Sequence, residues 1–321
     1  MSKTLFYAHG HPDEICQQKL TGARRAGRGN AFPLLDNSLK FMEVAKLEKT
    51  IFNVVSYSGG KDSTAMALKM IEEKIPIDCI LFCDTGLEFP QMYEHIDKFE
   101  RETGLNITRV KPDMPFEYLM FDKPVNRKNE SPIKIKYGTG KTGYGWPGPK
   151  MRWCTRALKD TPRERFIRAF TPYYEIRHYV GIAADETKRL ERKTNQNPSH
   201  VHPLVEWGMT EADCLQYCYS KGYDWGGRYE LFDRVSCWCC PLQPLEDLRK
   251  LRIHFPELWE QLKEWEDRNF RTYKPDYTVR ELELRFQFEE ECIRMGKPIR
   301  GKEFMAALRE RLAESRDGRK E

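Results

Sequence analysis

The sequence predicts an α/β fold, a doubly wound parallel sheet with helices on both faces, followed by a helical C-terminal region. Two observations predict it. Between residues 50 and 182, short apolar stretches alternate with stretches of helical periodicity, as in parallel strands joined by helices. From residue 245 onward, apolar residues recur every three or four positions between charged ones. We expect three parts: 1–49, an arm and helix; 50–241, the α/β domain; and 242–321, the helical region.

Composition excludes some classes of protein. No apolar run approaches the roughly 18 residues that span a membrane, and no stretch resembles a signal peptide, so we expect a cytoplasmic protein without membrane contacts. The ten cysteines should therefore be mostly reduced, and clustered ones indicate a metal or catalysis rather than disulfides.

In the N-terminal arm, His9, His11 and Cys16 could ligate a metal, and residues 37–49 suit an amphipathic helix.

The segment IFNVVSYSGGKDST, residues 51–64, joins an apolar stretch to a helical one through a Gly-Gly turn. We expect a strand over 51–57 and a helix over 62–74, with Asp62 or Ser63 as its cap. Glycines permit close backbone approach, and the first N–H groups of a helix favour an anion. The segment therefore predicts a phosphate site formed by Ser58, Gly59, Gly60, Lys61, Asp62 and Ser63.

Further strands are expected over 78–83 and 106–110, with a helix over 90–103 between them. Ligands of parallel sheets bind beyond the carboxyl ends of the strands, so Asp84 should lie near the phosphate site. An Asp followed by Gly at a strand end can serve a ribose, a Mg²⁺ ion or a turn. Candidate ligands in this stretch are Asp84, Thr85, Gly86 and Glu88.

Positive charge gathers after this region. Residues 123–168 contain 13 Lys or Arg and three Asp or Glu, although the whole chain has a net charge of +5. Within the basic insertion 123–150, Tyr137, Tyr144 and Trp146 lie among several glycines, which predicts a flexible loop that stacks on DNA or RNA bases. A solvated charged insertion and a polyphosphate site remain alternatives.

Cys154 follows the insertion, in the stretch 150–159. A helix from Met151 that ends before Pro162 would place Arg152, Arg156 and Lys159 along one side. These charges are expected to lower the pKa of the Cys154 thiol and favour the thiolate.

Tyr174 to Ile182 reads as another strand, and Thr210 with Asp213 as a helix-capping pair. The stretch Ser236-Cys-Trp-Cys-Cys-Pro241 then gives Cys237 and Cys240 the C-x-x-C spacing of a metal site, with Cys239 as a third sulfur. Cys214 and Cys218, four residues apart, could complete a zinc site.

These motifs together resemble the phosphoadenosine phosphosulfate (PAPS) reductase family within the N-type ATP pyrophosphatase, or PP-loop, superfamily. The resemblance rests on Ser-Gly-Gly-Lys-Asp-Ser, Asp-Thr-Gly-x-Glu-x-Pro, Arg-Trp-Cys-Thr, Gly-Ile-x-Ala-Asp-Glu and Pro-Leu-x-x-Trp. It implies an adenine nucleotide alpha hydrolase-like fold with ATP and Mg²⁺ beside Gly181 and Asp185. Ala183 departs from the pattern, because relatives often carry Arg there, and Arg189 could replace that Arg.

The resemblance also implies a 4Fe-4S cluster, because related reductases pair an upstream cysteine with a later C-x-x-C. Here the ligands would be Cys154, Cys237 and Cys240, with Cys239 as a fourth, and Zn²⁺ remains the alternative.

The PP-loop is intact, and Cys292, the one cysteine after residue 240, lacks the Glu-Cys-Gly context of the reductases. Both features favour an ATP-dependent sulfurtransferase that resembles the DNA phosphorothioation or tRNA thiolation enzymes. Lys61, Asp62, Asp84 and Arg152 would be catalytic. Partners would be ATP, DNA or tRNA through 123–150, a sulfur donor such as a cysteine desulfurase, and a second copy in a homodimer. Alternatives are a sulfonucleotide reductase and a nucleotide-binding redox sensor.

Overall fold

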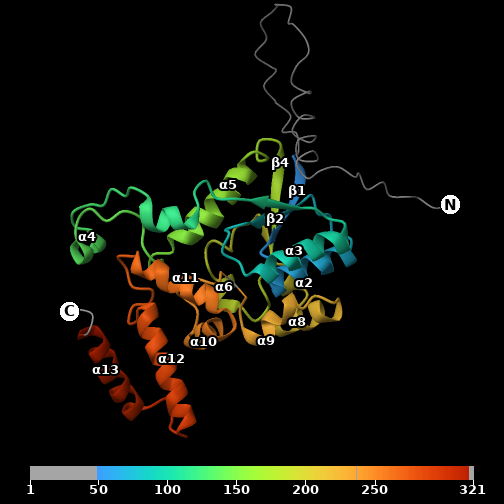
Figure 1. Ribbon diagram of the computed structural model, residues 1–321. Helices are drawn as coiled ribbons and strands as arrows, with labels where there is room; N and C mark the ends of the chain where they lie inside the picture. Colours follow the sequence, from blue (N-terminus) through green and yellow to red (C-terminus); the bar gives the residue numbers. More distant parts are fainter. Residues whose placement is uncertain (1–48, 236, 318–321) are drawn as a thin grey trace, which may run out of the picture. The chain divides into compact units, whose positions relative to one another are not determined.

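The computed structural model describes residues 49–235 and 237–317 (Figure 1). The predictions for the N-terminal arm, including His9, His11, Cys16 and nearly all of the expected helix 37–49, lie outside the described residues. Within the described ranges, none of the helices has the length and apolar character needed to cross a membrane.

The elements of the first two thirds of the chain are β1 (Thr50–Tyr57), α2 (Lys61–Glu72), β2 (Cys79–Cys83), α3 (Pro90–Thr103), β3 (Ile107–Val110), η1 (Tyr118–Asp122), α4 (Pro132–Tyr137), η2 (Thr155–Asp160), α5 (Thr161–Arg168), β4 (Tyr174–Val180), α6 (Thr187–Leu190), β5 (His200–Val201), α7 (Pro203–Glu206) and α8 (Glu211–Ser220). The remaining elements are η3 (Trp225–Gly227), α9 (Arg228–Leu231), α10 (Leu245–His254), α11 (Pro256–Asp267), α12 (Val279–Arg294) and α13 (Lys302–Asp317).

The strands form one five-stranded sheet in the order β3-β2-β1-β4-β5, and every neighbouring pair is parallel. The predicted parallel α/β sheet is therefore confirmed. β1 lies at its centre, with Val54 opposite Cys79 of β2 and His178 of β4. The central place of β1 brings the loop after it to the middle of the carboxyl edge, where parallel sheets bind ligands.

Helices cover both faces of the sheet, with α5 on one side and α2 and α3 on the other (Figure 1). Side chains of β1 alternate between these faces. Phe52 stacks on Phe170 after α5, with ring centroids 4.8 Å apart. Tyr57 points the other way, and its hydroxyl lies 3.2 Å from Thr64 Oγ1 and 3.1 Å from His95 Nε2. A strand buried on both faces explains why β1 reads as a continuous apolar run.

The described chain divides into two compact units. The first holds the sheet and comprises residues up to 84, 91–111 and 161–224. The second comprises 85–90, 112–160 and 225 onward, so the segment around Cys154 groups with the C-terminal helices. Our expected domain boundary after residue 241 remains a prediction.

The expected C-terminal helices are present with different bounds. The periodic stretch that begins at residue 245 is divided into two helices, α10 and α11, because Pro256 starts the second. Proline lacks an N–H donor and is tolerated in the first turn of a helix. Trp265 of α11 is buried against Trp238 and Trp146, with ring centroids 5.1 and 6.2 Å away.

The carboxylate of Glu266 ties the end of α11 to the segment that follows. It accepts hydrogen bonds from the backbone N–H of Tyr273, at 2.9 Å, and of Val279. Burial outweighs these bonds and raises the pKa of Glu266 to about 7. The folded protein therefore binds a proton at Glu266 more tightly than the unfolded chain does.

This pKa predicts a pH-dependent stability. As pH rises from about 4.5 to about 7, the unfolded chain loses its Glu266 proton while the folded state keeps it, so the free energy of unfolding falls by about 3 kcal/mol. Glu266→Gln should remove this part of the pH dependence in denaturant titrations. Glu257→Gln, at an exposed position of the same helix, should retain it. Parallel pH profiles for wild type and Glu266→Gln would contradict the assignment.

Candidate functional site

The residues predicted to bind phosphate lie in the loop between β1 and α2 and in the first turn of α2. The N-cap of α2 is Gly60, which has no side chain to accept a hydrogen bond from the first turn. The expectation that Asp62 or Ser63 caps this helix is wrong, because the helix begins at Lys61 and both residues lie inside its first turn. A helix start without a capping side chain is suited to binding an anion.

The two serines fix the shape of this loop. The Ser58 N–H donates to Ser63 Oγ at 3.2 Å, and the two hydroxyl oxygens lie 3.1 Å apart. The Ser63 hydroxyl in turn donates to the Gly60 carbonyl at 3.0 Å. The hydroxyls that we expected to contact phosphate therefore also hold the loop in place.

Two glycines allow neighbouring elements to approach the loop closely. Gly59 has φ +75°, and a Cβ atom there would lie 2.6 Å from Met92 Sδ of α3. A Cβ atom at Gly181, just after β4, would lie 3.0 Å from Cα and N of Ser63. No side chain fits at either position without displacement, so both glycines are needed to place the start of α2.

Lys61 is buried beside two carboxylates. Its Nζ lies 3.0 Å from Glu211 Oε2 and 3.4 Å from Asp62 Oδ1. Burial opposes the charge, but the two carboxylates outweigh it and raise the pKa of Lys61. The ammonium is therefore charged at neutral pH and lies at the start of α2.

Carboxylates from three segments converge at this point. Oxygens of Asp62, Glu186 and Glu211 all lie within 4.8 Å of one another, the one such group of His, Cys, Asp or Glu found across the described residues. Burial is the main cause that raises the pKa of Asp62, and the two glutamates add to it. Carboxylate oxygens in this arrangement suit a Mg²⁺ ion.

Sequence reasoning missed Glu186 and Glu211. Glu186 follows the predicted Asp185, whose Oδ1 accepts a 3.1 Å hydrogen bond from the Glu211 N–H. Glu211 is the first residue of α8, immediately after the capping box of Thr210 and Asp213, which is present as predicted. For Glu211 the available signal was an acidic residue directly after a helix cap, which is common without function, whereas Glu186 was part of the Gly-Ile-x-Ala-Asp-Glu motif.

Asp84 lies at the end of β2. Its Oδ1 accepts a 2.9 Å hydrogen bond from the Tyr93 hydroxyl, and Lys111 Nζ is 3.7 Å from its Oδ2. Arg189 pairs with Glu186 at 2.8 Å, so it is held within the carboxylate region. Ala183 is fully buried.

The rest of the Asp-Thr-Gly-x-Glu stretch belongs to the second unit. The Thr85 hydroxyl donates to Glu88, at 2.9 Å from both carboxylate oxygens, and Gly86 has φ +74°. Glu88 Oε1 also lies 3.7 Å from Lys159 Nζ and 4.0 Å from Cys237 Sγ. The predicted nucleotide ligands Thr85, Gly86 and Glu88 thus share a unit with the cysteines.

The cysteine turn, residues 237–241, is held through its backbone carbonyls. Gln243 Nε2 donates to the Cys237 carbonyl at 2.9 Å, and the Tyr273 hydroxyl donates to that of Cys240 at 3.0 Å. Lys274 Nζ donates to the Pro241 carbonyl at 2.8 Å. These bonds fix the turn without using the sulfur atoms.

Cys154 lies in the same unit as the turn and is close enough to influence its thiols. Burial, with smaller contributions from Glu88, Cys240 and Cys154, raises the pKa of Cys237 to about 11, although Lys159 opposes the shift. Burial likewise raises the pKa of Cys239 well above its usual value. Our expectation of a lowered pKa at Cys154 is wrong, because burial and Cys240 outweigh the effect of Arg152.

The helix around Cys154 also differs from the prediction. Thr155–Asp160 is π-helical, and α5 continues through Pro162 instead of ending before it. A π-helix has i→i+5 hydrogen bonds, so the expected row of Arg152, Arg156 and Lys159 at α-helical spacing does not form. Arg152 is exposed.

The remaining candidate cysteines lie elsewhere. Cys214 and Cys218 are buried on α8 in the first unit, where the Cys218 thiol donates to the Lys61 carbonyl at 3.4 Å. Cys292 is buried on α12 among Phe304, Leu308 and Leu312.

The basic insertion is more ordered than expected. It contains the helix α4, and Arg127 donates to the carbonyls of Lys141 and Gly143. Trp146 is fully buried, so the expectation that it stacks on bases is wrong. Tyr144 packs against Trp153, with ring centroids 5.2 Å apart.

The model of the phosphoadenosine phosphosulfate reductase domain matches residues 53–243, more than half of the chain. This chain belongs to the PAPS reductase family. Members of this family are enzymes of the PP-loop superfamily, and the match covers both the phosphate loop and the cysteine turn.

Curated relatives within the family are distant. An uncharacterized protein of Methanocaldococcus jannaschii is 27% identical over 69% of this chain and 42% of its own length. An uncharacterized protein of Escherichia phage 186 is 27% identical, over 68% of this chain and 75% of its own length. Adenosine 5'-phosphosulfate reductase 1 of Bacillus subtilis is 26% identical, over 54% of this chain and 67% of its own length. The chain spans less than half the length of the archaeal relative.

Among solved structures, a PAPS reductase from Candida auris aligns with 72% of this chain and 89% of its own. The alignment has 15% sequence identity and a TM-score of 0.36.

The tight packing at the loop gives a stability prediction. Gly59→Ala and Gly104→Ala both place a side chain at positive φ, +75° and +68°, but a Cβ meets nothing within 4 Å at Gly104. Both substitutions should lower the free energy of unfolding, because alanine is disfavoured at positive φ. Gly59→Ala should lower it by about 1–3 kcal/mol more, because its Cβ atom overpacks against Met92 and Ile96. Equal losses of unfolding free energy in denaturant titrations would show that α3 does not confine the loop.

Proposed function

We propose that the chain is an ATP-dependent, pyrophosphate-releasing sulfurtransferase that acts on nucleic acid or a nucleotide. The observation that carries the proposal is the start of α2, where Gly60 leaves the first turn without a capping side chain and a charged Lys61 is held beside it. This arrangement suits a polyphosphate, since the backbone N–H groups of a helix's first turn favour an anion and Lys61 adds a positive charge to the same turn.

In this proposal the first turn of α2 binds the β- and γ-phosphates of ATP. Lys61 stabilises the charge that develops on the leaving pyrophosphate while an oxygen of the acceptor attacks the α-phosphorus. A bond forms between the acceptor oxygen and the α-phosphorus, and the bond from the α-phosphorus to the oxygen that bridges to the β-phosphate breaks. The products of this step are the adenylated acceptor and pyrophosphate. A hydrosulfide then attacks the acceptor atom that carries the adenylated oxygen, the bond from that atom to the oxygen breaks, and AMP leaves with the oxygen.

The carboxylates fit a Mg²⁺ ion. Asp62, Glu186 and Glu211 would hold it, because their oxygens lie within 4.8 Å of one another and Mg²⁺ prefers oxygen ligands. The ion, when bound, would neutralise phosphate charge. Lys61 pairs with two of these carboxylates, so binding of the ion would leave its ammonium available to the phosphates.

The alternative of a sulfonucleotide reductase requires a cysteine that can reach the bound substrate. Cys292, which follows the cysteine turn in this chain, is 5% exposed and packs within the apolar cluster of α12 and α13. A thiol in that position cannot attack a substrate without unfolding of the two helices. This observation favours sulfur transfer from another source, such as a cysteine desulfurase.

The cysteines fit an iron-sulfur cluster better than a zinc ion. Zinc bound by thiolates at 2.3 Å places their sulfurs about 3.8 Å apart. Among the described residues, no three cysteine sulfurs lie within 4.8 Å of one another, although Cys154 and Cys240 are near enough to raise the pKa of Cys237. A larger 4Fe-4S group would suit such spacing. Bound there, it would supply an iron that can hold sulfur for transfer.

ATP binding should depend on Lys61. Lys61→Ala should weaken the affinity for ATP about tenfold or more, because a charge-assisted hydrogen bond contributes about 1.5–3 kcal/mol. Asp62→Ala should weaken binding of ATP in the presence of Mg²⁺. Calorimetric titration measures both.

Lys69→Ala is the matched control, because Lys69 lies on the same helix and pairs with Glu73 at its surface. It should bind ATP as the wild type does. If Lys61→Ala also binds ATP as tightly as the wild type, and PAPS binds better than ATP, the pyrophosphatase assignment is wrong.

Anaerobically prepared protein should contain about four irons per chain. Cys154→Ala, Cys237→Ala and Cys240→Ala should each lose them, as measured by iron and sulfide analysis and by visible absorption. Cys239→Ala should retain the cluster if three cysteines ligate it, and lose it if four do.

Cys292→Ala provides the control for this series, since Cys292 is buried, as Cys239 is, but packs between α12 and α13. It should keep the iron content of the wild type. Stoichiometric zinc without iron, in protein never exposed to air, would contradict the cluster.

A further inference from the structure

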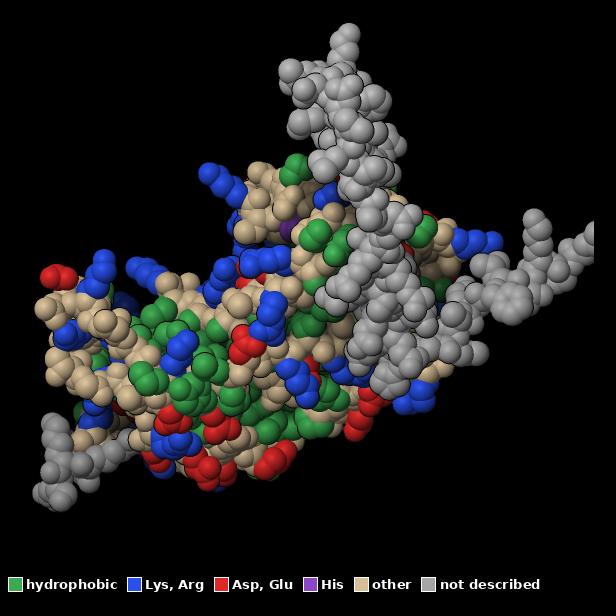
Figure 2. Space-filling view, turned by 90° about the horizontal axis from the view of Figure 1, so that it is seen from above, with side chains coloured by type: hydrophobic (Ala, Val, Ile, Leu, Met, Phe, Trp, Pro, Cys, Tyr) green, Lys and Arg blue, Asp and Glu red, His purple; other side chains and the backbone are tan. Residues whose placement is uncertain are grey.

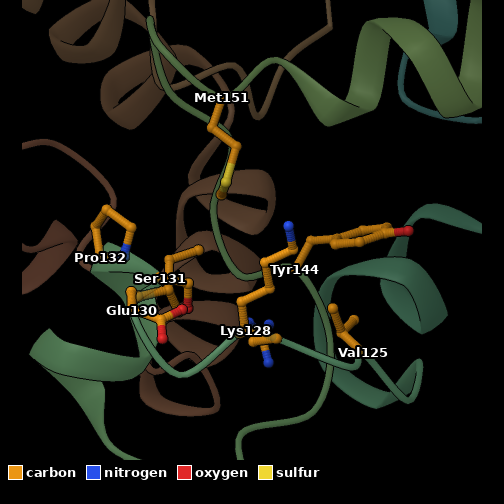
Figure 3. Close-up of a pocket in the computed structure, with 9 residues that line it drawn as sticks. Val125, Lys128, Glu130, Ser131, Pro132, Tyr144 and Met151 are labelled. Carbon is orange, nitrogen blue, oxygen red and sulfur yellow. The ribbon is translucent and has the colours of Figure 1, made fainter.

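The basic insertion, together with Met151, lines an open pocket of about 380 Å³ within the second unit (Figure 3). Its walls are largely apolar, formed by Val125, Pro132, Ile133, Tyr144 and Met151. In Figure 3, the side chain of Met151 points into the space between Ser131 and Tyr144. Pockets of this size with mainly apolar walls commonly bind small organic groups.

The pocket walls are fixed by backbone contacts. Arg127 donates to the carbonyls of Lys141 and Gly143, and the Tyr144 N–H donates to the Leu119 carbonyl at 2.8 Å. Trp153 packs against the Tyr144 ring. The pocket is therefore formed before any ligand arrives, which reduces the entropy lost on binding.

Positive charges surround this apolar space. Residues 123–150 contain seven Lys or Arg and a single acidic residue, Glu130. Lys128 lines the pocket, and Lys123 Nζ lies 5.1 Å from the centroid of the Tyr144 ring. Figure 2 shows Lys and Arg side chains around hydrophobic ones on the left, the side on which Figure 1 draws α4.

We propose that this pocket receives an unstacked nucleobase of a single nucleic-acid strand, whose phosphates contact the surrounding lysines. The inference rests on the proposed function, in which nucleic acid is the sulfur acceptor. Aromatic and apolar walls with cations outside them match a base joined to its phosphates.

Glu130 distinguishes this ligand from a fatty acid. It is the one acidic side chain of the insertion, and it lies on the pocket wall. A carboxylate there would repel another carboxylate, whereas it can accept a hydrogen bond from the amino group of a base.

Ile133 and Ile135 provide a matched pair on α4. Ile133 lines the pocket, whereas Ile135 is 73% exposed and does not. Ile133→Asp and Ile135→Asp add the same charge to the same helix, so any loss of attraction for phosphates should be similar. Only Ile133→Asp places a charge in the wall.

The experiment measures binding of a labelled single-stranded DNA oligonucleotide to the full chain by fluorescence anisotropy, at about 50 mM salt and above. Ile133→Asp should weaken binding about tenfold or more, within the 1–3 kcal/mol that one base stack contributes. Ile135→Asp should change it less than about threefold. Tyr144→Leu, which keeps an apolar side chain but removes the ring, should also weaken binding.

A strand of the same length without bases separates the pocket from the phosphates. Wild type should bind the abasic strand about as weakly as Ile133→Asp binds the normal one, and Ile133→Asp should bind both alike. If the two losses of affinity are not additive in this way, the substitution and the removal of the bases eliminate the same interaction.

Three results would overturn the inference. If Ile133→Asp and Ile135→Asp lose the same affinity for the strand, while binding by the wild type still depends on salt, the pocket does not bind a base, although nucleic acid remains the proposed acceptor. If the wild type does not bind the strand, nucleic acid is not the acceptor either. The proposal that the chain binds ATP is tested separately, by the Lys61 and Lys69 variants. Competition by free AMP as strong as by the strand, or a change of oligomeric state in Ile133→Asp alone, would indicate a small-molecule site or a contact between copies.

Discussion

The close packing around the first turn of α2 is the constraint on which the phosphate site depends. Met92 of α3 leaves no space for a side chain at Gly59, and the backbone of Ser63 in α2 leaves none at Gly181, just after β4. The backbone of the loop is thereby confined between two elements, and the helix starts at Lys61 with a glycine as its cap. Lys61 then lies where Glu211 can pair with it. The position of the Lys61 ammonium therefore depends on two glycines, at which a β-carbon would meet neighbouring atoms.

The stretch after β2 links this site to the cysteines along the chain. Asp84 belongs to the sheet unit, whereas Thr85 and Glu88 belong to the unit that holds the cysteine turn. Glu88 contacts Lys159 and Cys237, and the Leu87 carbonyl accepts a hydrogen bond from the Trp238 N–H. One short motif therefore serves two units. In the proposed function, these are the ATP unit and the sulfur unit.

Much of this architecture could be predicted, because apolar strands and amphipathic helices have distinct periods. The β1 strand and the α8 capping box follow directly from sequence. The predictions that are wrong depend on tertiary packing: Trp146 is covered by other aromatic rings, and burial reverses the expected pKa shift of Cys154. Glu186 and Glu211 were not predicted, because carboxylates from separate segments meet only in the fold. The cap at Gly60 was misassigned since Asp and Ser nearby are the more usual caps.

The central claim is that this family member cleaves ATP and does not reduce a sulfonucleotide. The most direct measurement is parallel detection of pyrophosphate and sulfite in anaerobic reactions that contain either ATP with a nucleic-acid acceptor or PAPS with a thiol reductant. The account predicts pyrophosphate that appears only with both ATP and acceptor, and no sulfite from PAPS. Release of sulfite from PAPS without any pyrophosphate from ATP would contradict it.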